Sequence, residues 1–183
     1  TTPRWTPGAF KGPLSGLKVL DFSMGWAGPL CTRTLADLGA EVIKIESSKH
    51  FDWWRGWEAD LGGDPPSTEV RLNFIAVNRG KRGIILELTT PEGLEKAKAL
   101  IAWADIVVEN FAAGVLDKLG LGQDVQRQIK PGIISLSMPA FGNGGPLSGL
   151  RAYGSTFVQG SGPPQIKGEG DVPPCFRQVG PRA

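Results

Sequence analysis

The sequence is poor in the side chains that most enzymes use for acid–base and metal chemistry. Its 183 residues contain one histidine, His50, and two cysteines, Cys31 and Cys175, which stand far apart. A Ser–His or Cys–His catalytic pair would have to use His50, which we interpret instead as a solvated loop residue. We interpret the cysteines as free thiols of a reducing, cytoplasmic compartment, with one disulfide as the alternative. No cluster of Cys, His and carboxylate ligands is visible, so we expect no metal.

Other absences exclude whole classes of protein. The 20 Lys and Arg against 18 Asp and Glu leave a net charge of +2, too small to indicate nucleic acid or an acidic membrane surface. No apolar run approaches the roughly 18 residues of a membrane helix, and Thr1 to Lys11 does not resemble a secretory signal. Neither a P-loop nor a complete G-x-G-x-x-G follows a strand, which counts against a nicotinamide oxidoreductase.

Short apolar runs and helical periodicities alternate along the chain. The apolar runs predict strands at residues 18–23, 41–46, 82–88, 105–109 and 133–137. Helices are predicted at residues 29–38, 90–104, 123–129 and 153–160, with a short helix within 110–118 and a long, turn-rich loop at 47–77. This alternation predicts an α/β fold, a Rossmann-like open, mainly parallel sheet flanked by helices.

Ligands of open α/β sheets bind beyond the carboxyl ends of the strands, so the segments that follow the strands are the candidate site. The turn at 24–29 exposes backbone N–H groups at a helix N-terminus, although a tight turn that only needs glycine fits equally well. Asn110 and Phe111 have side chains that can hydrogen-bond and stack on a ligand, or they are a turn and a core residue. Asp21 and Glu46 end strands, and we favour a loop-holding role for them over a catalytic one.

Eight blocks, taken in order, resemble the family III CoA-transferases, the CaiB/BaiF group. The blocks are PLSGLKVLDFS (13–23), AGPLCT (27–32), LADLGAEVIKIE (35–46), NRGKR (78–82), LELTTPEG (86–93), ADIVVENF (104–111), GVLDKLG (114–120) and AFGNGGP (140–146). The resemblance implies an irregular lead-in at 1–13, a CoA-binding large domain at 14–162 and a Gly/Pro-rich tail at 163–183. The family's small domain is absent from these 183 residues.

The resemblance also implies which residues lie against coenzyme A. The positions are Gly25, Trp26, Ala27, Ser47, Leu86, Asn110, Phe111, Lys118, Arg151 and Tyr153. Ser47 and Lys118 depart from the family pattern, because many members carry arginine at both positions. Tyr153 stands where the racemase branch carries histidine, which counts against a racemase.

The activity implied by the resemblance is transfer of CoA from an acyl-CoA thioester to a small carboxylic acid. An aspartate nucleophile would form a mixed anhydride and then an enzyme thioester. By spacing, that aspartate falls at Ala183 or beyond it, so we assign no catalytic residue and expect a truncated CoA-binding portion of a homodimeric enzyme. The alternatives are a non-catalytic CoA-binding or interaction module and an acyl-CoA racemase.

Overall fold

The computed structural model describes residues 12–55, 72–152 and 154, and within them a five-stranded parallel sheet. The strands run in the order β3-β2-β1-β4-β5, and each pairs in parallel with its neighbours. Their bounds are β1 Lys18–Asp21, β2 Glu41–Glu46, β3 Arg82–Ile85, β4 Ile106–Glu109 and β5 Ile134–Ser137. The predicted Rossmann-like, mainly parallel sheet is therefore confirmed.

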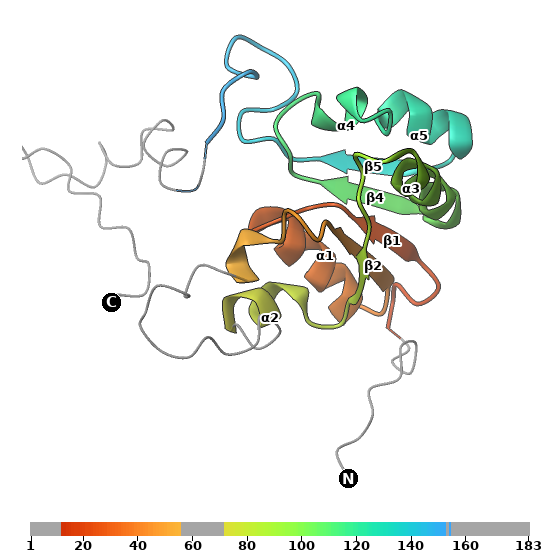
Figure 1. The fold of residues 1–183 in the computed structure, drawn as a ribbon. Helices are drawn as coiled ribbons and strands as arrows, with labels where there is room; N and C mark the ends of the chain where they lie inside the picture. Colours follow the sequence, from red (N-terminus) through yellow and green to blue (C-terminus); the bar gives the residue numbers. More distant parts are fainter. Residues whose placement is uncertain (1–11, 56–71, 153, 155–183) are drawn as a thin grey trace, which may run out of the picture.

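The helices cover the sheet from both sides (Figure 1). On one side α1 (Ala27–Asp37) packs against β1, β2 and α2 (Leu72–Asn78), and on the other α3 (Pro91–Trp103) packs against α5 (Gln123–Ile129). The short helix α4 spans Val115–Lys118. Right-handed crossovers explain this division, since the chain moves outward from β1 to β3 and then returns to β4 and β5 in the opposite direction.

The core is built from the buried strands. Because side chains alternate across a strand, Val19 joins the apolar cluster beneath α1, while Leu20 joins the larger cluster with Ala97 and Ile101 of α3. These four side chains are at most 1% exposed. The near-continuous apolar sequence of β1 thus follows from burial on both faces.

Local signals position α3 as the sequence predicts. The Thr90 hydroxyl accepts a hydrogen bond from the Gly93 N–H at 3.1 Å, and Pro91 occupies the first turn, where its missing N–H is not needed. Helix α1 ends just before Gly39, whose φ of 102° is readily adopted only by glycine.

The prediction of a long loop at 47–77 is wrong in part. The structure has a short 3-10 helix, η1 (Trp53–Arg55), and places α2 at Leu72–Asn78. Seven residues are too few to show a clear helical period, and α2 is stabilised by tertiary packing, with Phe74 and Val77 buried. Of the predicted helix at 153–160 only residue 154 is described, and the tail at 163–183 and Cys175 lie outside the described residues.

The structure also bears on the cysteines, on membrane-spanning helices and on metal ligands. Cys31 is a free thiol in the described part of the chain. Among the residues that the structure describes, no helix is long and apolar enough to cross a membrane, and no three His, Cys, Asp or Glu side chains gather as metal ligands would.

Candidate functional site

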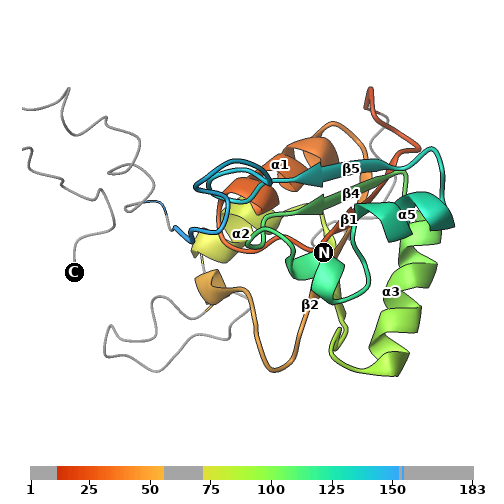
Figure 2. The same cartoon turned by 90° about the horizontal axis from the view of Figure 1, so that it is seen from above.

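The candidate site is the carboxyl edge of the sheet at the point where the strand order reverses. β1 lies between β2 and β4, so the segments that follow β1 and β4 leave the sheet toward opposite faces. At such a reversal of strand order a ligand crevice is expected between the two segments. Figure 2 shows the carboxyl ends of the strands, the start of α1, η1 and the loop after β5 on one side of the molecule.

Asp21, at the end of β1, is the centre of a buried polar network. Its Oδ1 accepts hydrogen bonds from the backbone N–H of Ser23 at 2.9 Å and from the Ser23 hydroxyl. Its Oδ2 accepts from the Thr32 hydroxyl of α1 at 2.6 Å and from the Lys81 ammonium at 2.9 Å. Burial alone would raise the pKa of Asp21, but Lys81, Lys44 and these hydrogen bonds lower it below its ordinary value. The carboxylate is therefore charged and fully hydrogen-bonded, which is the loop-holding role favoured from the sequence.

Lys81 has its three ammonium hydrogens matched by three acceptors. These are Asp21 Oδ2 at 2.9 Å, the Pro29 carbonyl at 2.9 Å and Asn78 Oδ1 at 2.8 Å. Its side chain is 2% exposed, and this burial lowers its pKa from 10.5 to about 8 against the opposing effect of Asp21. Lys81 thus ties the end of α2 to the start of α1.

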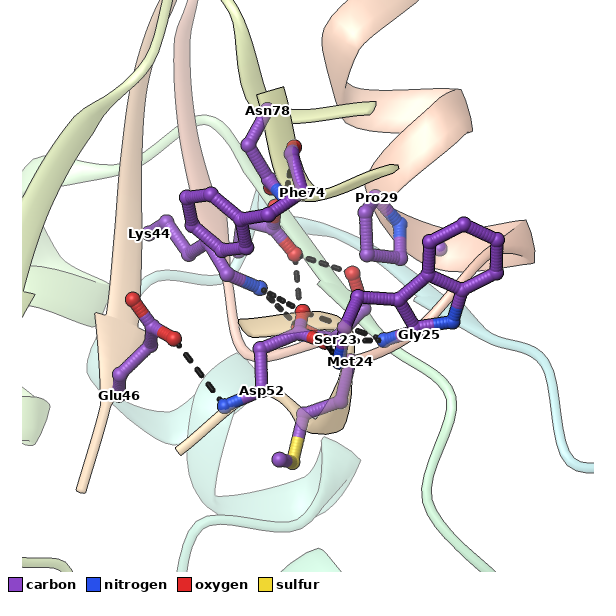
Figure 3. A network of polar contacts seen from close by, with 12 residues as sticks. Ser23, Met24, Gly25, Pro29, Lys44, Glu46, Asp52, Phe74 and Asn78 are labelled. Carbon is purple, nitrogen blue, oxygen red and sulfur yellow. Dashed lines mark hydrogen bonds and ion pairs between the residues drawn. The ribbon is translucent and has the colours of Figure 1, made fainter. Parts of the chain in front are cut away.

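Two more ion pairs lie beside this network, and Figure 3 shows Lys44 and Asp52, the partners of one of them. Arg55 of η1 contacts both carboxylate oxygens of Glu46, with its closest nitrogen at 2.7 Å. Burial would raise the pKa of Glu46, but the bonds from Arg55 lower it. Lys44 lies 3.2 Å from Asp52, and the two side chains are 2% and 0% exposed. These two carboxylates therefore each have a cation of their own.

The turn between β1 and α1 is held by contacts with Trp53 and with Asn110. Gly25 has φ of 75°, and a Cβ there would lie 2.5 Å from the Trp53 ring, so its missing side chain serves both conformation and packing. The side chain of Asn110, which follows β4, donates to the Met24 carbonyl and accepts from the Met24 N–H, both at 2.8 Å. This pair of bonds joins the two segments that flank the crevice.

Two residues of the turn face outward. Trp26 is 51% exposed, and its ring lies 4.9 Å from that of Trp54. Trp26 also occupies the position before α1 and gives that helix no side-chain cap. The N–H groups of the exposed Ala27 and of Gly28 therefore begin the helix without a capping side chain, which suits a negatively polarised ligand atom.

The remaining predicted CoA residues are placed differently. The Ser47 hydroxyl donates to Glu87 at 2.8 Å and accepts from the Lys49 N–H at 3.0 Å, so it stabilises its own loop. Leu86 is 7% exposed and belongs to the core, and Phe111 packs against the same core. Of these three, only Ser47 has a polar side chain, and the buried Leu86 offers a ligand little exposed surface.

The basic residues that could contact the phosphates of CoA fall into two groups. Lys118 and Arg151 are exposed, and neither pairs with a carboxylate of the described residues. In the cluster at 79–82, by contrast, Arg79 pairs with Asp37 at 2.8 Å, Lys81 is buried and Arg82 pairs with Glu41 at 3.0 Å. Tyr153 lies outside the described residues, and His50 is exposed as predicted.

A cavity of about 520 Å³ lies beside β2, β3 and α2, and its lining includes Glu46 at the carboxyl end of β2 and Arg55 of η1. No predicted CoA residue in the described part of the chain lines it. Its five cations are each paired with a carboxylate: Lys44, Arg55, Arg79, Lys81 and Arg82. We place the candidate site at the strand-order reversal, because that crevice follows from the topology of the sheet.

Sequence reasoning missed Lys44 and Asp52, and it did not predict that Lys81 is buried. One signal was present: Lys44 interrupts the otherwise apolar centre of EVIKIE, and a cation inside a buried strand needs a charged or polar partner. The partner, Asp52, lies in the loop after β2, and the sequence does not show that this loop returns to Lys44.

This arrangement defines an α/β protein of the Rossmann type, with its candidate ligand site at the strand-order reversal beside β1 and β4. The sequence profile of CoA-transferase family III matches residues 14–181. The succinate–glutarate CoA-transferase of Agrobacterium fabrum is 38% identical over 90% of this chain and 41% of its own length. The human succinyl-CoA:glutarate CoA-transferase is 37% identical over 85% of this chain and 34% of its own length.

Solved structures agree with the sequence comparison. A CaiB/BaiF family protein from Brucella suis superposes with a TM-score of 0.80 at 39% identity, over 93% of this chain and 44% of that one. The orthorhombic crystal form of Rv3272 from Mycobacterium tuberculosis gives 0.79 at 34% identity, over 90% and 44% of the two chains. The chain belongs to CoA-transferase family III, and it spans less than half the length of these relatives.

Proposed function

We propose that this chain is the CoA-binding portion of a transferase that moves CoA from an acyl-CoA thioester to a small carboxylic acid. The observation that carries the proposal is the turn at 24–28, which is held rigidly by buried polar groups and presents an uncapped helix start at the crevice. A preformed site loses little conformational entropy on binding. Family membership supplies the class of ligand.

Within this proposal, different residues contact different parts of coenzyme A. Trp26 and Ala27 contact the thioester end, and Asn110 holds the turn that presents them. Lys118 and Arg151 are the cations for the phosphates, because they are exposed and free of carboxylate partners in the described part of the chain. Ser47, Leu86, Phe111 and Tyr153 complete the proposed contacts.

The reaction proposed for the whole enzyme follows the family. A carboxylate attacks the thioester carbonyl and expels the CoA thiolate, which leaves a mixed anhydride. The thiolate then attacks the enzyme's carbonyl of that anhydride, releases the donor acid and forms an enzyme thioester, from which the acceptor acid takes CoA. A homodimer in the cytoplasm is the assembly and location that accompany this proposal.

Calorimetric titration of the chain with CoA and with NAD tests the binding step. We expect CoA binding and no NAD binding, and a Lys118→Met variant that binds CoA about three- to tenfold more weakly because it loses a phosphate cation. Lys96→Met is the matched control, since Lys96 is an exposed cation on α3 paired with Glu92 at 2.6 Å. Binding of NAD, or equal effects of the two variants, would contradict the proposal.

A non-catalytic CoA-binding module is the second candidate. The observation that favours it is that the buried carboxylates of the described edge are all engaged in ion pairs. Acyl transfer between a CoA thioester and a free acid, assayed with a longer protein that contains these 183 residues, separates the two candidates, because a module would bind CoA without turnover.

A further inference from the structure

We propose that Asp52 is a positioning residue that sets the turn between β1 and α1 for the CoA thioester. The inference rests on the proposed function, since the turn is proposed to contact CoA. Asp52 itself is not a candidate contact, because its side chain is 0% exposed.

Asp52 connects two segments that are distant in the sequence. Both of its carboxylate oxygens accept from the Gly25 N–H, at 3.1 and 3.2 Å, and Oδ1 also accepts from the Trp54 N–H at 3.1 Å. A single side chain therefore fixes the turn after β1 and starts η1. Its own N–H donates to Glu46 at 3.2 Å, which attaches Asp52 to the end of β2.

Lys44 completes the arrangement, and Figure 3 shows its side chain reaching toward Ser23 and Asp52. Its ammonium lies 3.2 Å from Asp52 Oδ2 and donates to the Ser23 carbonyl at 2.5 Å. The ion pair thus holds the turn at two points: Lys44 binds the Ser23 carbonyl, and Asp52 binds the Gly25 N–H. Both charges are buried, so their attraction is screened less than that of a surface pair.

These bonds decide which groups of the turn remain for a ligand. The Gly25 N–H is already used by Asp52, so a ligand oxygen cannot take it without breaking that bond. The next exposed residues are Trp26 and Ala27, whose positions follow from the φ of 75° at Gly25. Asp52 acts on the ligand through the conformation of Gly25 and has no contact of its own.

A single substitution at Lys44 or Asp52 would leave the other charge buried and unpaired, which destabilises the fold. A loss of CoA affinity could then come from lower stability and not from a displaced turn. Two double variants avoid this problem: Lys44→Met/Asp52→Asn and Lys44→Met/Asp52→Leu. Both remove the two charges and the bond from Lys44 to Ser23. They differ in one feature, since asparagine keeps an acceptor for the Gly25 N–H and leucine, of similar size, does not.

The test measures amide hydrogen exchange at Gly25 and CoA affinity by calorimetry, with thermal unfolding as the check on folding. We expect the Asn variant to retain Gly25 protection and to bind CoA within about threefold of the unmodified chain. The Leu variant should lose protection and bind about tenfold more weakly, because the turn is no longer preorganised. Asp37→Asn, at an exposed ion pair on α1, is the surface control.

Equal protection and equal affinity in the two double variants would overturn the role of Asp52. Absence of CoA binding by the unmodified chain would overturn the proposed function instead, and the exchange of Gly25 would still decide the positioning role. If neither double variant folds, Gly25 exchange in the unmodified chain is compared with that of the exposed Gly144. Equally fast exchange at both glycines would contradict the bond to Asp52.

Discussion

Replacement of Gly28 by alanine tests the packing between the start of α1 and the end of β1. A Cβ at Gly28 would lie 2.2 Å from Ser23 Cβ, 2.4 Å from Ser23 Oγ and 3.3 Å from Asn110 Cγ. Ser23 cannot rotate away cheaply, because its hydroxyl and its N–H both donate to the buried Asp21. The helix start must therefore move away from the strand.

Two opposing effects set the magnitude. Alanine in place of glycine inside a helix contributes about 1 kcal/mol of stability. Overpacking of a close contact typically costs about 1–3 kcal/mol, and we take about 3 kcal/mol because the neighbour is fixed by two hydrogen bonds. The net loss in the free energy of unfolding is then about 2 kcal/mol, equivalent to a Tm lower by about 4–8 °C.

Thermal unfolding and CoA titration of the same preparations measure both consequences. A shifted helix start displaces Trp26 and Ala27, so CoA affinity should fall together with the Tm. Gly132→Ala is the control, because no atom lies within 4 Å of its Cβ position and its Tm should stay within about 1–2 °C. A Gly28→Ala variant as stable as the unmodified chain would refute the packing argument.

Two other predictions concern Lys81 and Thr90. The pKa of Lys81 is about 8 in the folded chain, against an ordinary 10.5. Between these two pH values the unfolded chain binds more protons than the folded chain. The free energy of unfolding therefore rises with pH in this range, by at most about 3 kcal/mol. Denaturant titrations from pH 7 to 11 should show this rise as a difference between the unmodified chain and Lys81→Met, and a constant difference would contradict it. Thr90→Ala should lower the free energy of unfolding by about 1 kcal/mol through loss of the cap on Gly93, whereas Thr89→Ala, an exposed neighbour, should change it by less than about 0.5 kcal/mol.

The sheet could be predicted from the sequence because its strands are buried on both faces. KVLD and IVVE are short, nearly continuous apolar runs bounded by turn residues, which is what a central parallel strand requires. The start of helix α3 could also be predicted, from the capping residue Thr90 and from Pro91 in the first turn. Helix α2 could not be predicted from the sequence, because it is stabilised by contact with α1 and its own residues carry no clear helical pattern.

The place of the candidate site could also be predicted, but not the groups that hold it. Strand ends and the glycines at 25 and 28 indicate a turn at the edge of the sheet. The bonds from Lys81 to Asp21 and from Asn110 to Met24 join residues 60 and 86 positions apart. Such pairs have no spacing rule, so a single sequence shows the charges without showing which ones meet.

The buried network also bears on which carboxylate could attack a thioester. A nucleophilic carboxylate needs a free lone pair and access to the substrate carbonyl. Asp21 and Asp52 are both 0% exposed, and each oxygen of Asp21 already accepts two hydrogen bonds. Both oxygens of Glu46 are held by Arg55. These three carboxylates therefore build the site, and the nucleophile of the proposed reaction has to be a different residue.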